Sequence, residues 1–191
     1  MTIKQKSSIA SIVIEARKAQ SIINDYSQGQ IDELILAVAW EVIQPENNQK
    51  LSEMAVKHTG LGNVEDKMRK NRRKTIGLLR DLKGVKTVGV INQDIKKGLT
   101  EIARPVGVVG AIVPSTNPIA TPLNKVINAL KCRNAVRLAP SPKGAIVCRD
   151  VFCMLTCDSL VSWPSVGIIK GQLNCWLLLR ACSAGKRGKR T

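Results

Sequence analysis

Apolar residues recur at helical spacing through the first part of the chain. They fall every three or four positions from residue 9 to residue 23, and the pattern returns in residues 31–42 after the polar stretch SQGQ. Two more helices are predicted at residues 47–60 and 63–84. Residues suited to helix ends support these limits: Ser7 or Ser8 as the first N-cap, Asn63 as the fourth, and Gly60 and Gly84 at the C-terminal ends.

The pattern then changes to that of strands. Residues 85–91 and 98–106 are predicted to pair as a β-hairpin around the connection NQDIKK. The next stretch, GVVGAIV at residues 107–113, is continuously apolar, which is typical of a parallel strand buried on both faces.

A helix and a further strand follow this apolar run. The helix is predicted to begin near Thr121, as N-cap, and Pro122, in the first turn, and to end at about Cys132. Residues 134–140 (NAVRLAP) form the next strand, which completes a right-handed βαβ unit. The predicted fold is therefore α/β: N-terminal helices, a hairpin and the first βαβ unit of a Rossmann-like doubly wound sheet, with a ligand at the carboxyl ends of the strands.

The composition agrees with a folded domain and shows that the chain is strongly basic. The 191 residues are 44% hydrophobic, and 30 basic residues against 14 acidic ones give a net charge of +16. Such a surplus attracts nucleotides, phosphates or nucleic acid. Aromatic residues make up only 3%, which argues against RNA modules that stack bases on surface rings.

Nucleic-acid binding stays open as an alternative because DKMRKNRRK, residues 66–74, is densely basic. The simpler interpretation is a solvated helical face, with Met68, Ile76 and Leu79 forming the inner stripe of that helix. A third alternative is a non-catalytic interaction protein that binds a full-length relative.

Targeting and metal signals are not seen in the sequence. The N-terminal segment has charges inside its apolar region, and no apolar stretch is long enough to span a bilayer, so a cytoplasmic protein without membrane contact is expected. The six cysteines contain no Cys-x-x-Cys pair, and the one histidine, His58, lies far from them, so neither a metal site nor a disulfide is predicted. We interpret Cys132 as a small buried residue.

The last forty residues do not resemble the rest of the chain. Residues 151–191 contain four of the six cysteines and two of the three tryptophans and finish in a basic stretch, and no helix or strand period is sustained after about Met154. We therefore divide the chain into residues 1–150, part of a cofactor-binding domain, and an atypical tail at 151–191. We interpret the tail as frameshifted or degenerate sequence, beginning near residues 148–155.

Two motifs carry a resemblance to a known family. The stretch RPVGVVGAIVPSTNPIATPLNKVINALKCRNAV at residues 104–136, followed by LAPSPKGA at 138–145, resembles the aldehyde dehydrogenase superfamily. The resemblance is to its coenzyme-A-acylating branch, which includes the sulfoacetaldehyde-type and bifunctional alcohol/aldehyde dehydrogenases. It covers roughly the first 150 residues and rests on several motifs in order at the right spacing.

The resemblance implies roles for two loops. Asn117 would donate its side-chain N–H to the oxyanion that forms when a cysteine attacks the aldehyde. Pro114, Ser115 and Thr116 would run beside the nicotinamide and its ribose. The turn that contains Ala139, Pro140 and Ser141 would lie near the adenosine ribose. From the residues alone, Asn before Pro is more often a turn or cap residue than a catalytic one, whereas for the Ser-Pro pair a plain loop and a cofactor role are about equally supported.

The resemblance also implies a reaction and its limits. The family oxidises a small aldehyde with NAD or NADP, and the acylating branch transfers the acyl group to coenzyme A as co-substrate. Many non-acylating relatives have a lysine where Ala139 stands, with Lys143 further on here, which favours the acylating branch and leaves NAD against NADP open. None of the cysteines matches the nucleophile's position. We therefore expect a truncated enzyme that is poorly soluble and inactive alone, with the hairpin as a contact in a homo-oligomer or with a full-length relative.

Overall fold

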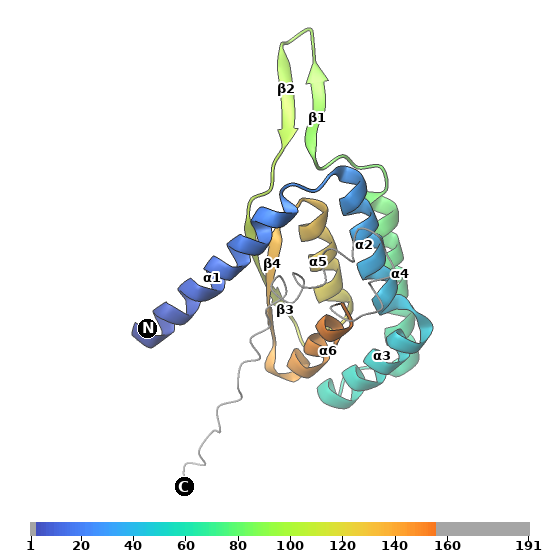
Figure 1. The fold of residues 1–191 in the computed structure, drawn as a ribbon. Helices are drawn as coiled ribbons and strands as arrows, with labels where there is room; N and C mark the ends of the chain where they lie inside the picture. The colour runs from blue at the N-terminus through green and yellow to red at the C-terminus, as the bar shows by residue number, and fades with distance from the viewer. Residues whose placement is uncertain (1–2, 156–191) are drawn as a thin grey trace.

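The computed structural model describes residues 3–155, with side chains from residue 9 onward. Four helices come first, and a hairpin, a βαβ unit and a last helix follow (Figure 1). The elements are α1 (Ile3–Ile23), α2 (Gln28–Ile43), α3 (Pro45–Thr59), α4 (Val64–Leu82), β1 (Gly89–Asp94), β2 (Leu99–Ala103), β3 (Val108–Val113), α5 (Ala120–Lys131), β4 (Ala135–Pro140), the 3₁₀ turn η1 (Pro142–Gly144) and α6 (Ala145–Leu155). Of the predicted tail only residues 151–155 are described, and they complete α6; the rest of 151–191 lies outside the described residues.

The helix ends follow local side-chain and backbone chemistry. Gly60 ends α3 in the left-handed region, with φ 68°, where a side chain would be strained. The Asn63 side-chain oxygen accepts from the backbone N–H of Asp66 at 2.8 Å and so caps α4. Both predictions are confirmed, and Gly84 (φ 77°) follows the C-cap of α4. The prediction of a cap at Ser7 or Ser8 is wrong, because α1 begins at Ile3.

The core lies between α2, α3, α5, α6 and one face of the β3–β4 pair. Helix α2 is buried along most of its length, and the predicted inner positions of this helix (Ile31, Ile35, Val38, Ala39 and Val42) are all at most 4% exposed. Apolar burial of this kind is the main source of stability for such a helix. No helix within residues 3–155 combines the length and hydropathy needed to cross a membrane.

β3 and β4 pair in parallel, from Val108 opposite Ala135 to Val113 opposite Pro140. Helices α2 and α5 lie on one side of this pair and α1 on the other (Figure 1). Ala111 and Val113 are buried, but Ile112 is 79% exposed, so the prediction of a strand buried on both faces is wrong. The reason is that α1 covers only part of the second face among the described residues.

The predicted hairpin is present with shifted limits. β1 starts at Gly89 rather than residue 85 and runs on to Asp94, so half of the predicted connection NQDIKK belongs to the strand. The hairpin extends away from the helices (Figure 1), and its apolar side chains are largely in solvent. An isolated two-stranded hairpin is marginally stable in water, so this element depends on its base for its position.

Helix α5 begins two residues earlier than predicted, with a different N-cap. Its N-cap is Ile119, with no side-chain hydrogen bond, so Thr121 lies inside the first turn and is not the cap. Pro122 lies in the first turn, as predicted, where the missing N–H leaves no intrahelical bond unmade.

A polar network joins the base of the hairpin to α2 and α5. The Lys131 ammonium, on a side chain only 2% exposed, lies 2.5 Å from Asp32 Oδ1. Gln28 donates to the same carboxylate oxygen at 2.9 Å, and its own Oε1 accepts from the backbone N–H of Thr87 at 2.7 Å. The Thr87 hydroxyl donates to the Lys131 carbonyl at 2.5 Å. Each buried polar group in the network therefore has a partner, as buried charge requires.

Asp32→Asn tests this network. The change leaves the buried Lys131 ammonium without its counter-charge, so we expect the free energy of unfolding to fall by about 2–3 kcal/mol. Urea unfolding followed by circular dichroism measures this loss. Asp25→Asn, at an exposed carboxylate in the α1–α2 connection, is the matched control and should change stability little. Equal stability of the two variants would show that the ion pair contributes nothing measurable.

Candidate functional site

The carboxyl ends of β3 and β4 bring the two predicted loops together. The backbone N–H of Ser141 donates to the Val113 carbonyl at 2.9 Å and extends the parallel pairing past Pro140. A Cβ added at Gly144 would lie 3.1 Å from Pro118 Cβ, 3.3 Å from Ser141 Oγ and 3.7 Å from Ser115 Cα. Residues 114–118 and 141–144 are therefore in contact, with Gly144 as the small residue between them.

Asn117 lies in the turn between β3 and α5, at the edge where a ligand is expected in a parallel sheet. Its side chain is half-buried, and its Oδ1 is buried without a hydrogen-bond partner among the described residues. Pro118 and Ile119, which follow it, are buried and anchor the turn. A buried, unpartnered amide oxygen costs about 1–3 kcal/mol, so a group of this kind needs an explanation beyond packing.

The six predicted cofactor-binding residues line the same edge of the sheet. Pro114, Thr116 and Ala139 are exposed. Ser115, Pro140 and Ser141 are half-buried, and the Ser141 hydroxyl oxygen is buried without a partner among the described residues. The structure brings the two segments to the same edge, and their roles in cofactor binding stay predictions.

Neither Cys132 nor Cys148 is arranged as a nucleophile beside Asn117. Cys132 follows α5, whose twelve residues separate it from Asn117 by about 18 Å of helix, and it is exposed, so its predicted burial is wrong. Cys148 is buried in α6, and burial raises the pKa of its thiol to about 12. A thiol with that pKa stays protonated near neutral pH and does not act as a nucleophile.

Helix α4 buries a polar stripe that sequence reasoning missed. Lys67, Asn71 and Thr75, spaced four residues apart, are all buried, whereas Ile76 of the predicted inner stripe is 43% exposed. Asn71 donates to Asn48 Oδ1 at 3.0 Å and to Ser52 Oγ at 3.3 Å, which ties α4 to α3. The signal was available as an i, i+4, i+8 polar repeat, but it was hidden inside a basic run.

Lys67 lines a pocket of about 260 Å³ that also touches the predicted site. Its walls are the α3–α4 connection, the first two turns of α4, and Thr116, the residue before Asn117. The lining residues are Leu61, Gly62, Asn63, Asp66, Lys67, Lys70 and Thr116. The basic residues Arg69, Arg72, Arg73 and Lys74 of the same helix are instead exposed, as predicted for a solvated face.

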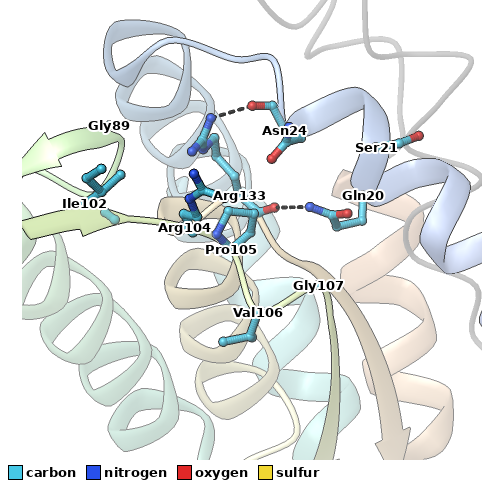
Figure 2. Close-up of a pocket in the computed structure, with 11 residues that line it drawn as sticks. Gln20, Ser21, Asn24, Gly89, Ile102, Arg104, Pro105, Val106, Gly107 and Arg133 are labelled. Atoms are coloured by element: carbon cyan, nitrogen blue, oxygen red, sulfur yellow. Dashed lines mark hydrogen bonds between the residues drawn. The ribbon is translucent and has the colours of Figure 1, made fainter.

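A larger hollow of about 650 Å³ lies at the other end of the parallel strands (Figure 2). It is lined by α1, the base of the hairpin and the corner before β4, where Arg133 has φ 57°. Gln20 Nε2 donates to the Arg133 carbonyl at 3.4 Å, and the Arg133 guanidinium donates to the Asn24 carbonyl (Figure 2). These bonds fix α1 against the corner, and none of the predicted site residues lines this hollow.

Comparison with known proteins identifies what the chain is similar to. A family model described as "Aldehyde dehydrogenase family" matches residues 1–157. Sulfoacetaldehyde dehydrogenase (acylating) from Cupriavidus necator strain H16 is 60% identical over 140 residues, which cover 73% of this chain and 28% of that protein.

Solved structures give the same result for the fold. An acetylating aldehyde dehydrogenase from Geobacillus thermoglucosidasius superposes with a TM-score of 0.76 and 34% identity, over 83% of this chain and 34% of that one. An engineered glycolyl-CoA reductase with bound NADP⁺ superposes with a TM-score of 0.68 and 25% identity, over 88% of this chain and 36% of that one. The chain therefore spans 28% to 36% of the length of these proteins, and its fold is a part of theirs.

Gly144→Ala tests the contact between the two loops. The added methyl would lie against Pro118 and Ser141, so we expect the loops to separate and the free energy of unfolding to fall by about 1–3 kcal/mol. Gly77→Ala in α4 is the matched control, because nothing lies within 4 Å of its added Cβ. It should stabilise the helix by up to about 1 kcal/mol. Thermal unfolding compares the two, and a neutral Gly144→Ala would contradict the close packing.

Proposed function

Because the chain belongs to the aldehyde dehydrogenase family, in its acylating branch, we propose that it carries the N-terminal part of an enzyme that converts an aldehyde, coenzyme A and NAD(P)⁺ into an acyl-CoA and NAD(P)H. The similarity to an acylating dehydrogenase and to a CoA-thioester reductase supports this reaction. The described residues would supply the oxyanion donor and part of the cofactor cradle of a Rossmann-like doubly wound domain.

Asn117 is the observation that carries the proposal. It stands at the carboxyl end of β3 and before the first turn of α5, with both neighbouring elements anchored in the core. We assign its Nδ2 the role of donor to the aldehyde oxygen as negative charge develops there. A donor held by a rigid turn does not have to reorganise during the reaction, which is why it stabilises a transition state better than water does.

The cofactor would lie along the edge formed by the two loops. Pro114, Ser115 and Thr116 would contact it on the nicotinamide side, and Ala139, Pro140 and Ser141 on the adenosine side. When bound, NAD or NADP accepts the hydride and coenzyme A accepts the acyl group. The buried, unpartnered Ser141 hydroxyl and Asn117 amide oxygen support a polar ligand or a further segment at this edge.

The relatives also suggest the kind of aldehyde. The matched protein from Cupriavidus necator acts, by its name, on sulfoacetaldehyde, and the identity of 60% covers the segment that contains Asn117. We therefore propose a short aldehyde that carries an acidic group as the substrate.

The nucleophilic thiol would come from outside the described residues. Cys148 is buried and protonated, and Cys132 lies beyond the far end of α5 from Asn117. We propose that the 191-residue chain has no turnover by itself. Aldehyde-dependent reduction of NAD or NADP by the purified chain would contradict this.

A chimaera tests the role of Asn117. The 140 matched residues of the Cupriavidus enzyme are replaced by the corresponding residues of this chain, and CoA-dependent NAD(P)H formation from sulfoacetaldehyde is measured. We expect activity in the chimaera and a loss of about 10²- to 10³-fold in kcat with Asn117→Ala.

Asn128→Ala provides the matched control for this loss. Asn128 is exposed on α5 and bonds only to the Asn124 carbonyl among the described residues, so its removal should leave kcat unchanged. An active chimaera in which Asn117→Ala keeps full kcat would refute the oxyanion role.

The hairpin is the contact that we propose for self-association. Val90 and Ile102 are cross-strand partners that are 52% and 53% exposed, and Ile95 at the tip is 87% exposed. An exposed edge with apolar side chains is a template for pairing with another chain. The partner would be a second copy of this chain or a full-length relative.

Replacing the apolar pair tests this contact. If Val90 and Ile102 are buried in the assembly, Val90→Ser with Ile102→Ser should weaken self-association by about tenfold or more. Sedimentation velocity over a concentration series measures this change. The control pair is Asn92→Ser with Glu101→Ser, at the neighbouring cross-strand position, where both side chains are exposed. Equal effects of the two pairs would contradict a contact through the apolar residues.

A further inference from the structure

Lys67 is a buried cation without a counter-charge in the described part of the chain. The residue is only 5% exposed, yet its side-chain ammonium makes no hydrogen bond or ion pair within residues 9–155. Lys131, a second lysine of low exposure, shows the usual solution, since its ammonium lies 2.5 Å from a carboxylate. The Lys67 ammonium is not sealed off but faces a pocket, and a largely desolvated lysine in this position favours an anionic partner in that pocket.

The pocket in front of Lys67 has the size and charge for a small anion. Its volume of about 260 Å³ is below the range of about 300–1,000 Å³ that drug-sized ligands occupy. Lys70 lines it from one turn further along α4. Asp66 also lines it, but its carboxylate accepts from Asn63 Nδ2 at 2.7 Å and lies 4.0 Å from the Arg69 guanidinium. The Asp66 carboxylate is thus bonded to the N-cap residue of α4 rather than to Lys67.

The positive charges around Lys67 would attract an anion. Burial and the nearby Lys70 ammonium lower the pKa of Lys67, and burial and Lys74 lower the pKa of Lys70. A bound anion would act in the opposite direction, because an opposite charge nearby favours the protonated form of a lysine.

We propose that Lys67, with Lys70 and the Thr116 segment, binds the acidic group of the aldehyde substrate. This rests on the proposed function, which gives the substrate an acidic group and places its carbonyl at Asn117. Thr116 lines the pocket and is directly bonded to Asn117, so their Cα atoms lie about 3.8 Å apart. In sulfoacetaldehyde a single methylene separates the sulfonate from the carbonyl carbon, so both groups must be held by neighbouring residues. Lys67 would then determine the preference for acidic over neutral aldehydes.

The anion could also be a phosphate of the cofactor, because a sulfonate and a phosphate ester share their chemistry. The substrate is favoured by position. The pocket touches the loop after β3 only at Thr116, and none of Ala139, Pro140 and Ser141, on the proposed adenosine side, lines it. A free phosphate, a nucleotide and a sulfonate are therefore separate arms of the test.

The experiment uses the complete 191-residue chain with ¹³C-labelled lysine. Isethionate, the alcohol that corresponds to sulfoacetaldehyde, is titrated while NMR follows the lysine Cε signals, and ethylene glycol is the neutral control. Lys67→Met assigns the signal and tests affinity, and Lys50→Met, at an exposed lysine of α3, is the matched control. Inorganic phosphate, NADP⁺ and coenzyme A are titrated in the same way. Circular dichroism checks that each variant is folded.

The expected result is a saturable shift of the Lys67 signal with isethionate and a raised pKa of Lys67. Ethylene glycol should have no effect, and the affinity for isethionate should fall by about tenfold to a hundredfold in Lys67→Met but not in Lys50→Met. If Lys67→Met does not fold, Lys67→Arg assigns the signal, and the response of that signal in the wild-type chain decides. A Lys67 signal that does not move overturns the proposal. So does one that responds more strongly to NADP⁺, coenzyme A or phosphate, since that would assign the pocket to the cofactor.

The outcomes also separate this inference from the proposed function. If isethionate binds at Lys67 but the chimaera is inactive, the anion site is supported and the proposed aldehyde dehydrogenase function is contradicted. If the chimaera is active but the Lys67 signal does not shift with isethionate, the proposed function is supported and only the anion site is contradicted.

Discussion

The parallel pairing of β3 with β4 is the constraint on which the site depends. Two parallel strands need a crossover between them, and α5 supplies it, so the chain must leave β3, turn at residues 114–119 and return before β4 can pair. The bond from Ser141 N–H to the Val113 carbonyl extends this pairing by one step at the carboxyl end. Because both strands end at the same edge, the two loops have to meet, and Gly144 leaves the space for them to do so. Asn117 owes its position to this geometry rather than to any contact of its own side chain.

The same two strands show which surface the described chain leaves open. One face of the pair is packed with α2, α5 and α6, but Ile112, Gly110 and Ala139 are exposed on the other. A stable sheet usually has three or more strands or a helix packed on its apolar face, and this two-stranded pair leaves part of one apolar face open. The exposed hairpin adds further apolar surface at the opposite end of the molecule. Both features agree with a chain that spans about 28% of its Cupriavidus relative, because the remaining length of such an enzyme is available to cover them. The polar atoms without a partner among the described residues, at Asn117 and Ser141, lie at the carboxyl ends of the same two strands.

Sequence reasoning succeeded where one local rule decides the structure. Gly60 and Asn63 set helix ends through backbone conformation and a single side-chain bond, and the change from helical to strand period located the βαβ unit. It failed where distant segments decide. Ile112 belongs to a run that is apolar throughout, so its exposure depends on which elements are present to cover it. Cys132 follows an otherwise buried helix end but points to solvent. In α4 the predicted inner stripe is only partly right: Leu79 packs against the core, but Ile76 is 43% exposed, and the α3 amides and hydroxyls select Asn71 and, with it, Lys67. Hydrophobic pattern cannot detect an interface that is held by polar groups.

The contrast between two buried lysines connects packing to function. Lys131 and Lys67 are both nearly inaccessible, so each brings a large desolvation cost. For Lys131 the cost is offset within the chain by Asp32, and the pair contributes to the junction of α2, α5 and the hairpin. For Lys67 no ion pair is formed within the described residues: the pocket wall adds the positive charge of Lys70, and its one carboxylate, Asp66, bonds to Asn63 instead. A structural lysine and a binding lysine can have the same exposure, and the difference lies in whether the counter-charge is part of the fold. Since Thr116 joins the pocket to Asn117, an anion at Lys67 would complete the charge balance of the fold only while substrate is bound.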